Sequence, residues 1–174
     1  MDSWRNTCIF PGMMNRRTVL GAAAGISAIP LTATAAQAAS SRVYSAQQFG
    51  VEPDAARDQS TALQDAIDKA AKNGGYLILP PGTYVARNLK ISTPFCLQGM
   101  PGLTRLIFLG NGQLLQAGAA KDITLSGIVF DGAKQAISGD TNALVTLDGI
   151  SNLTIEQCDF RGSSANALAL RGCA

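Results

Sequence analysis

Two segments of this chain lie thirty residues apart and share one pattern of apolar and polar residues, which narrows the fold more than any other feature. The first reads KDITLSGIVFDG, residues 121–132, and the second reads SNLTIEQCDFRG, residues 151–162. The two have little identity, but in register an apolar-Thr-apolar triplet coincides, and Phe130 meets Phe160. Apolar and polar residues alternate within each copy, as they do in a half-buried strand and not in a helix.

A second alternating run follows each copy after a small polar connection, so that strand, turn and strand recur in one order. These runs are ALVTLDG, residues 143–149, and ALALRG, residues 167–172. A rough period of about 23 to 31 residues is typical of a solenoid, whose coils have too little core to be stable alone and stack on one another. With 47% hydrophobic and 15% charged residues, the chain is apolar enough to build such a core. We therefore predict an all-β fold, a parallel β-helix. The expected inward ladders are Ile123/Leu153, Leu125/Ile155 and Phe130/Phe160.

One helical segment precedes these strands. It reads DQSTALQDAIDKAAKNGG, residues 58–75; Asp58 or Ser60 can cap its start, and the Asn-Gly-Gly triplet ends it. Its apolar face consists of Leu63, Ala66, Ile67 and Ala70. The open end of a strand stack exposes unpaired N–H and C=O groups, which a helix can cover. We therefore predict a short N-terminal capping helix at about residues 60–72, followed by coils at about residues 76–174.

The first 38 residues differ from the rest and are typical of an export signal. An Ala/Gly-rich apolar run over residues 19–31 is followed by a candidate A-x-A cleavage site at Ala36 and Ala38. This run is well short of the ~20 residues that cross a bilayer, which disfavours the alternative of an uncut membrane anchor. We predict a signal peptide over residues 1–38 and a domain over residues 39–174 that is not an integral membrane protein.

The paired arginines Arg16 and Arg17 indicate an export route. Residues 15–20, NRRTVL, resemble the twin-arginine (Tat) pattern, in which the pair precedes bulky apolar residues. An ordinary Sec signal with two incidental arginines is the alternative. Tat export predicts the Tat translocase as a partner and a periplasmic or extracellular location in a bacterium. Residues 1–12 fit the signal poorly, so translation starting at Met13 or Met14 is a further expectation.

Charge and residue types exclude several functions. Residues 39–174 contain 11 Lys and Arg against 11 Asp and Glu, so no basic patch indicates nucleic acid as a partner. The chain has no His, which excludes a His base, a Ser-His-Asp triad and His-containing zinc sites. Cys96 lies in the apolar PFCLQG and Cys158 aligns with Ile128, so we interpret both as small core residues.

The segment from residue 47 to 91 carries a resemblance to a known superfamily. It reads QQFGVEPDAARDQSTALQDAIDKAAKNGGYLILPPGTYVARNLKI and resembles the entry segment of the pectin-lyase-like right-handed parallel β-helix proteins. Phe49-Gly50, Asp58, Gly75 and LPPGTY (residues 79–84) stand at matching places, and the likeness extends over about residues 44–174. With the twin-arginine pattern, the N-terminal part of the chain is similar to bacterial Tat-translocated repeat proteins of uncharacterised activity.

The resemblance implies where an active site would lie. Polygalacturonase-like members carry an Asn-Thr-Asp element, paired aspartates on the next coil, a Gly-His-Gly and an Arg-x-Lys. Here the corresponding coils read GDTNALVTL and SSANALAL, so that Asp140 alone echoes the first element and Ala165-Asn166 replaces the pair. Pectate-lyase-like members need clustered carboxylates for Ca²⁺ and an Arg or Lys base. The weak catalytic candidates are Asp131, Asp140, Asp148 and Asp159, and Glu156 completes the carboxylates that a coil surface could cluster; solvated turn carboxylates are the alternative.

Two functions follow from these expectations. The first is an exported β-helix that binds or processes a polysaccharide, as a lyase or glycoside hydrolase if it is active. The second is a protein without catalysis, either a structural or interaction protein of the cell envelope or an inactive truncated fragment. It ends in ALALRGCA without the polar cap that solenoids need, so we expect a β-helix truncated after its first coils. No cofactor is expected, and Ca²⁺ has no support beyond the scattered carboxylates.

Overall fold

The computed structural model describes residues 43–138 and 142–174. The predicted signal peptide, with Arg16, Arg17, Ala36 and Ala38, lies outside these residues, and so does the candidate Asp140.

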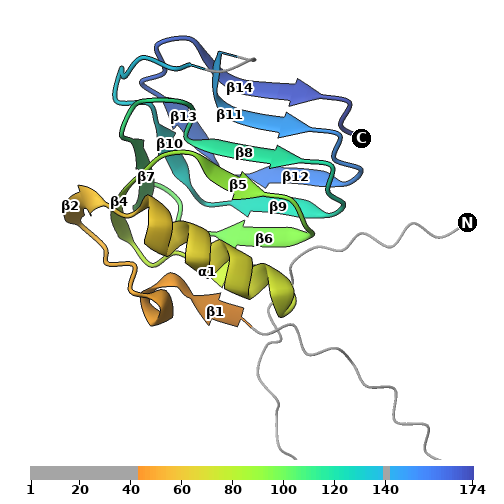
Figure 1. Cartoon of the computed structure of the whole chain (residues 1–174), viewed down its shortest axis with the longest axis horizontal. Coiled ribbons are helices and arrows are strands. Elements are labelled where there is room, and N and C mark those ends of the chain that lie inside the picture. Colours follow the sequence, from red (N-terminus) through yellow and green to blue (C-terminus); the bar gives the residue numbers. More distant parts are fainter. Residues whose placement is uncertain (1–42, 139–141) are drawn as a thin grey trace, which may run out of the picture. The chain divides into compact units, whose positions relative to one another are not determined.

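Fourteen short strands in the described residues form three sheets, and every strand pair among them is parallel (Figure 1). Sheet A consists of β1 (Val43–Ser45), β3 (Tyr76–Ile78), β6 (Phe95–Gln98), β9 (Ile123–Ser126) and β12 (Leu153–Glu156). Sheet B consists of β2 (Ala55–Asp58), β4 (Gly82–Ala86), β7 (Thr104–Phe108), β10 (Val129–Asp131) and β13 (Asp159–Arg161). Sheet C consists of β5 (Leu89–Ile91), β8 (Leu115–Gly118), β11 (Ala143–Asp148) and β14 (Asn166–Arg171).

The order of these strands shows that the chain winds in coils. Each coil gives one strand to sheet A, then one to sheet B and one to sheet C, as in β3, β4, β5 and again in β6, β7, β8. The first coil has β1, the 3-10 turn η1 (Ala46–Phe49) and β2, but then the helix α1 (Ser60–Lys72) where the others have a strand of sheet C. The predicted all-β parallel β-helix with a short capping helix is thus confirmed.

Three inward ladders run through the core from coil to coil. They are Leu77–Leu97–Leu125–Ile155 in sheet A, Tyr84–Leu106–Phe130–Phe160 in sheet B and Leu89–Leu115–Val145–Leu168 in sheet C. The predicted pairing of Phe130 with Phe160 is confirmed, and their rings stack with centroids 5.0 Å apart and planes 12° apart. Phe130 is fully buried, whereas Phe160 in the last described coil is partly exposed.

Short turns separate sheets A and B and explain why small residues recur there. Gly127 follows β9 with φ +67°, a left-handed conformation that favours glycine, and a Cβ there would come within 2.6 Å of the carbonyl oxygen of Gly99. The next residue points inward, as Ile128 in one coil and Cys158 in the next. Cys158 donates its thiol to the carbonyl oxygen of Leu125, 3.5 Å away, and burial raises the pKa of this thiol.

The interpretation of Cys158 as a core residue is therefore confirmed, but that of Cys96 is wrong. In β6 the inward side chains are Phe95 and Leu97, which are buried, while Cys96 and Gln98 point to the outer face and are partly exposed. The sequence PFCLQG does not show which of its residues point inward, because a cysteine is compatible with either face of a strand.

The turn between β3 and β4 is built on the Pro80-Pro81-Gly82 segment and fixed by a buried phenol. Tyr84 donates its hydroxyl to the carbonyl oxygen of Pro80 at 2.8 Å. Burial, with the nearby charge of Asp54, raises the pKa of Tyr84 to about 12. The phenol therefore stays neutral and keeps its donor at every physiological pH.

Helix α1 begins where Asp58 accepts hydrogen bonds from the backbone N–H and the hydroxyl of Ser60. These bonds, with Arg87 nearby, hold the pKa of the Asp58 carboxyl below its ordinary value of 3.8. The predicted apolar face is confirmed, because Leu63, Ala66, Ile67 and Ala70 are all buried.

The helix also satisfies the edge of sheet C. Gln64 donates its amide N–H to the carbonyl oxygen of Lys90 at 3.0 Å and accepts the backbone N–H of Lys90 at 2.8 Å. These are the two groups through which a neighbouring strand would bind β5. A side-chain amide thus takes the place of a strand in the first coil.

Candidate functional site

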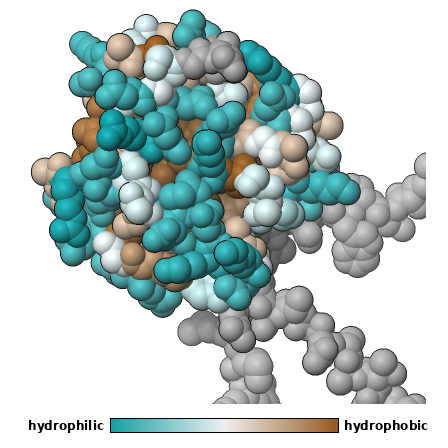
Figure 2. All heavy atoms as spheres, viewed as in Figure 1, coloured by the Kyte–Doolittle hydropathy of each residue, from teal (hydrophilic) through white to brown (hydrophobic). Residues whose placement is uncertain are grey.

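The outer face of sheet C carries polar side chains at matching positions of successive strands. Lys90 of β5 is in register with Gln116 of β8, and Gln116 with Thr146 of β11, so the three form one column across the strands. On either side of this column the residues point inward and are buried, because side chains alternate along a strand. In the same view as Figure 1, hydrophilic residues cover much of the visible surface and hydrophobic ones show between them (Figure 2).

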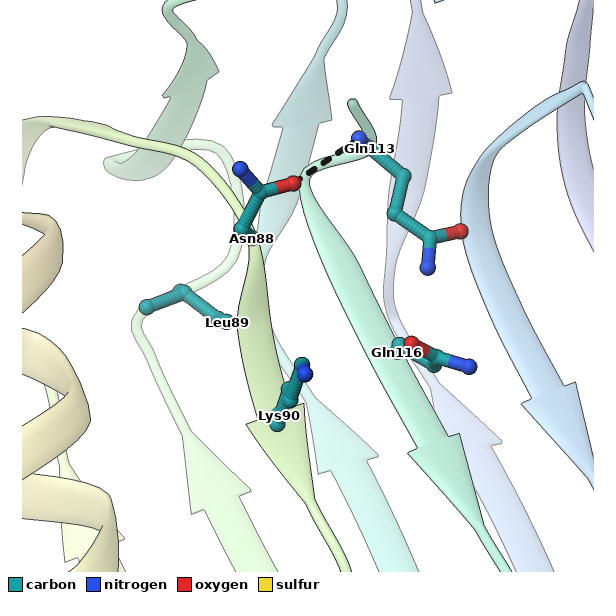
Figure 3. A pocket seen from close by; sticks show the side chains of 5 residues that line it. All are labelled: Asn88, Leu89, Lys90, Gln113 and Gln116. Carbon is teal, nitrogen blue, oxygen red and sulfur yellow. Dashed lines mark hydrogen bonds between the residues drawn. The ribbon is translucent and has the colours of Figure 1, made fainter. Parts of the chain in front are cut away.

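A shallow depression with a volume of about 270 Å³ lies over the first two strands of this face. Its lining residues are Asn88, Leu89, Lys90, Gln113 and Gln116 (Figure 3). In the figure the side chains of Lys90 and Gln116 project from neighbouring strands, while Asn88 and Gln113 lie where those strands begin. Four of the five lining side chains are therefore polar, and one of them is a cation.

Asn88 ties together the turns that precede β5 and β8. It has φ +54° and accepts the backbone N–H of Gln113 at 3.3 Å, the dashed contact of Figure 3. It also donates its amide to the carbonyl oxygen of Asn111 at 3.1 Å. Asparagine tolerates a left-handed conformation because its short side chain bonds the nearby backbone. The upper end of the depression is thus rigidly built.

Thr146 orients the amide of Gln113 over this face. Its side chain is on the outer side of β11, yet the residue is only 3% exposed. The hydroxyl donates to the amide oxygen of Gln113 at 2.9 Å. Because the oxygen is engaged, the NH₂ group is the part of this amide that can donate to a ligand. The depression therefore offers amide donors and one ammonium group, which suit hydroxyl and carboxylate oxygens.

The predicted carboxylates lie elsewhere, on three different faces. Asp131 and Asp159 point outward from sheet B, Glu156 is on sheet A, and Asp148 ends β11 of sheet C. Asp131 and Asp159 share sheet B, whereas Asp148 and Glu156 lie on the other two sheets, because each coil turns its three strands toward different sides. Within residues 43–138 and 142–174, no group of three or more acidic or cysteine side chains could hold a metal ion.

Asp131 has a structural setting. One carboxylate oxygen lies 3.4 Å from Nε of Arg161 and 3.9 Å from a guanidinium nitrogen of Arg105, on the two neighbouring strands. The other accepts the backbone N–H of Ala133 at 2.9 Å and so starts the turn after β10. The side chain is 18% exposed, so its contacts hold three coils together.

The polar column was missed at the level of the sequence, although a signal for it exists. Three triplets carry this signal: LKI (residues 89–91), LQA (residues 115–117) and VTL (residues 145–147). In each of them a polar residue lies between two apolar ones, and the three belong to successive coils. Reading the repeat backwards from residues 121–132 into the earlier coils would have aligned Lys90, Gln116 and Thr146.

Comparisons with known proteins agree with this architecture. The family described as rhamnogalacturonase A/epimerase, pectate lyase-like, matches residues 43–104. No curated protein matches the sequence. The A-module of mannuronan C-5 epimerase AlgE4 from Azotobacter vinelandii superposes with a TM-score of 0.60 and 22% identity, over 75% of this chain and 41% of that one.

Two further solved structures share the fold. ORF18 of Geobacillus virus E2 has a TM-score of 0.59 at 20% identity, over 69% of this chain and 26% of its own length. A protein from Parabacteroides merdae, described as a candidate glycosyl hydrolase, has a TM-score of 0.51 at 14% identity, over 76% of this chain and 81% of its own. The chain thus spans less than half of the first two structures.

No helix within the described part of the chain is long and apolar enough to cross a membrane. The coil order, the three parallel sheets and the capping helix show that this chain has the parallel β-helix fold, and its first coils, residues 43–104, are similar to the pectate lyase-like family.

Proposed function

We propose that the outer face of sheet C binds an extended polysaccharide. The observation that carries this proposal is the column of Lys90, Gln116 and Thr146, which runs along the axis of the solenoid beside the depression. Neighbouring strands are about 4.8 Å apart, so the exposed side chains of Lys90 and Gln116 offer polar groups to a ligand at successive strands, while the buried Thr146 holds the amide of Gln113 beside them. The names of the matching family and of the AlgE4 module refer to polysaccharide chemistry, which supports this choice of ligand.

The described residues of this face favour binding over hydrolysis. Asp148 is the single acidic residue in the four strands of sheet C, and it is in register with Arg171. Cleavage of a glycosidic bond by the usual mechanism takes two carboxylates, one as acid and one as base or nucleophile. Asp148 lies two residues beyond Thr146 on the same strand, about 7 Å away along it. The geometry therefore supports recognition of the polymer by this part of the chain.

Export completes the proposal. A polysaccharide of the cell envelope or the surroundings is reached only after the chain leaves the cytoplasm. The signal expected at residues 1–38, with Arg16 and Arg17, supplies such a route through the Tat translocase. We propose a periplasmic or extracellular location on this basis.

Affinity electrophoresis tests the binding proposal. The purified protein is run in native gels that contain mannuronan, rhamnogalacturonan or a neutral glucan, and we expect one of these polymers to slow it. Lys90→Gln should weaken the retardation about tenfold, which corresponds to the roughly 1.4 kcal/mol expected for one charge-assisted hydrogen bond.

The matched control is Lys121→Gln, which removes the same charge from an exposed turn between β8 and β9. This variant should migrate like the original protein at each polymer concentration once its own charge change is corrected. Equal losses in the two variants would mean that the polymer senses net charge and not the sheet C face. No retardation by any of the three polymers would refute the proposed function.

A further inference from the structure

Helix α1 forms a step at one end of the polar face. It occupies the place of a strand of sheet C in the first coil, and Gln64 fixes it to the backbone of Lys90. With its side chains an α-helix is about 10–12 Å across, about twice the spacing of strands in a sheet. Its inner side chains are buried in the core, while Asp65, Asp68 and Lys72 are exposed on the other side. The helix therefore ends the row of sheet C strands, and its exposed side chains lie at this end of the polar face.

A second depression lies at the foot of this step, with a volume of about 250 Å³. Its lining residues are Ile67, Asp68, Ala71, Lys72, Lys90, Ile91, Ser92 and Thr93. Lys90 lines both depressions, so the first one on sheet C and this one at the helix adjoin each other at its side chain. A ligand that follows the polar column toward the first coil would pass Lys90 and enter the second depression.

The second depression differs in character from the first. Ile67 and Ile91, which are 2% and 3% exposed, lie at its base with Ala71. Hydroxyls from Ser92 and Thr93 and charged groups from the helix form its rim. An apolar base with a few polar groups at the rim is the arrangement that holds one face of a compact ligand and orients its edge. A pyranose ring has such a C–H face and a hydroxyl edge.

We propose that this second depression is a terminal subsite that receives the end unit of the polysaccharide, with α1 as the wall that stops the chain. The inference rests on the proposed function of sheet C and deepens it. A polymer that runs along the solenoid axis finds no further strand of sheet C past β5, because α1 takes that place and its side chains border the second depression. The site therefore recognises chain ends in preference to internal stretches.

The test compares chains that differ in the number of their ends. Mannuronan and rhamnogalacturonan are each offered to the full protein as long polymer and as short oligomers, at equal mass concentration, and binding is followed by intrinsic fluorescence and calorimetry. Oligomers supply many more ends per unit mass. We expect half-saturation at a mass concentration about tenfold lower for the oligomers of the polymer that binds, because the molar concentration of ends is higher at equal mass while the affinity for each end is the same.

A variant that fills the second depression separates this subsite from the face of sheet C. Ala71→Leu adds bulk at the base and keeps a strong helix former, so the helix should persist. It should abolish the preference for oligomers. Thr61→Leu, at an exposed position of α1 that does not line the depression, should leave the preference intact.

The outcomes distinguish the two proposals. Equal binding of polymer and oligomer on a mass basis would overturn the terminal subsite and leave polysaccharide binding by sheet C standing. A preference for oligomers that survives Ala71→Leu would also overturn it. No binding of either sugar in any form would refute the proposed function, and the terminal subsite would fall with it.

Discussion

The stacked pair of Phe130 and Phe160 offers a measurement of how much one coil depends on the next. Phe130 has a neighbour on both sides, Leu106 in the coil before and Phe160 in the coil after, and it is fully buried. Truncation of a buried phenylalanine to alanine costs about 3–5 kcal/mol, because the lost transfer free energy adds to that of the cavity. We expect Phe130→Ala to fall in this range.

Phe160→Ala should cost less, because Phe160 is partly exposed and has one described neighbour in its ladder. Full burial of such a side chain contributes about 1.5–3 kcal/mol, and about half of this applies here. The ring stack adds roughly 0.5–1.5 kcal/mol. The expected loss in the free energy of unfolding is therefore about 1–3 kcal/mol, clearly below that of Phe130→Ala.

Urea unfolding followed by circular dichroism measures both losses, with the midpoint and the slope fitted for each variant. Leu103→Ala is the control, because Leu103 is 59% exposed and should change the stability by less than about 0.5 kcal/mol. Losses of equal size at Phe130 and Phe160 would refute the reasoning, since they would mean that the partial exposure of Phe160 does not reduce its contribution to the free energy of unfolding. A loss below about 1 kcal/mol at Phe130 would contradict the register itself.

Three further predictions concern the helix, the export signal and acid stability. Gln64→Leu should lower the free energy of unfolding by about 1–3 kcal/mol, because the N–H and C=O of Lys90 lose their partners; chemical denaturation checks this, and an unchanged midpoint would contradict the edge-capping role. Replacing Arg16 and Arg17 together by Lys should block export, measured by fractionation of cells, and continued export would point to the Sec route. The lowered pKa of Asp58 means that the ionised carboxyl contributes to stability above pH 3.8, and that this contribution is lost as the pH falls through the lowered folded-state pKa. Between pH 5 and pH 2, Asp58→Asn should therefore lose less stability than the original protein. Parallel curves of stability against pH for the two proteins would contradict this.

The fold was accessible from the sequence because its later coils keep one pattern. Phe130 and Phe160 occupy the same place in two copies of the repeat, and the alternation around them fixes which residues point inward. The capping helix was equally clear, since Leu63 and Ile67 recur at helical spacing. In both cases the spacing of apolar residues within one short segment predicts the element and its buried face, and the structure has that element.

The site depended on relations that no local period contains. Lys90 and Gln116 are 26 residues apart in the chain and adjacent in space only because one full coil separates them. Asp148 and Asp159 are close in sequence, but a coil with three sides sends them to different faces. Residues that are close in sequence within one coil lie on different sheets, while residues at equivalent positions of successive coils are neighbours in one sheet.

The hydrogen bonds of Gln64 also protect the edge of sheet C against pairing with a foreign strand. An uncovered strand edge is a template on which a foreign strand can pair, and β5 would present such an edge wherever the solenoid has no earlier strand in sheet C. With the amide of Gln64 already bound to both backbone groups of Lys90, an incoming strand must first displace two hydrogen bonds and move a helix whose inner face is buried. The first coil therefore protects this edge of β5 against the addition of a foreign strand.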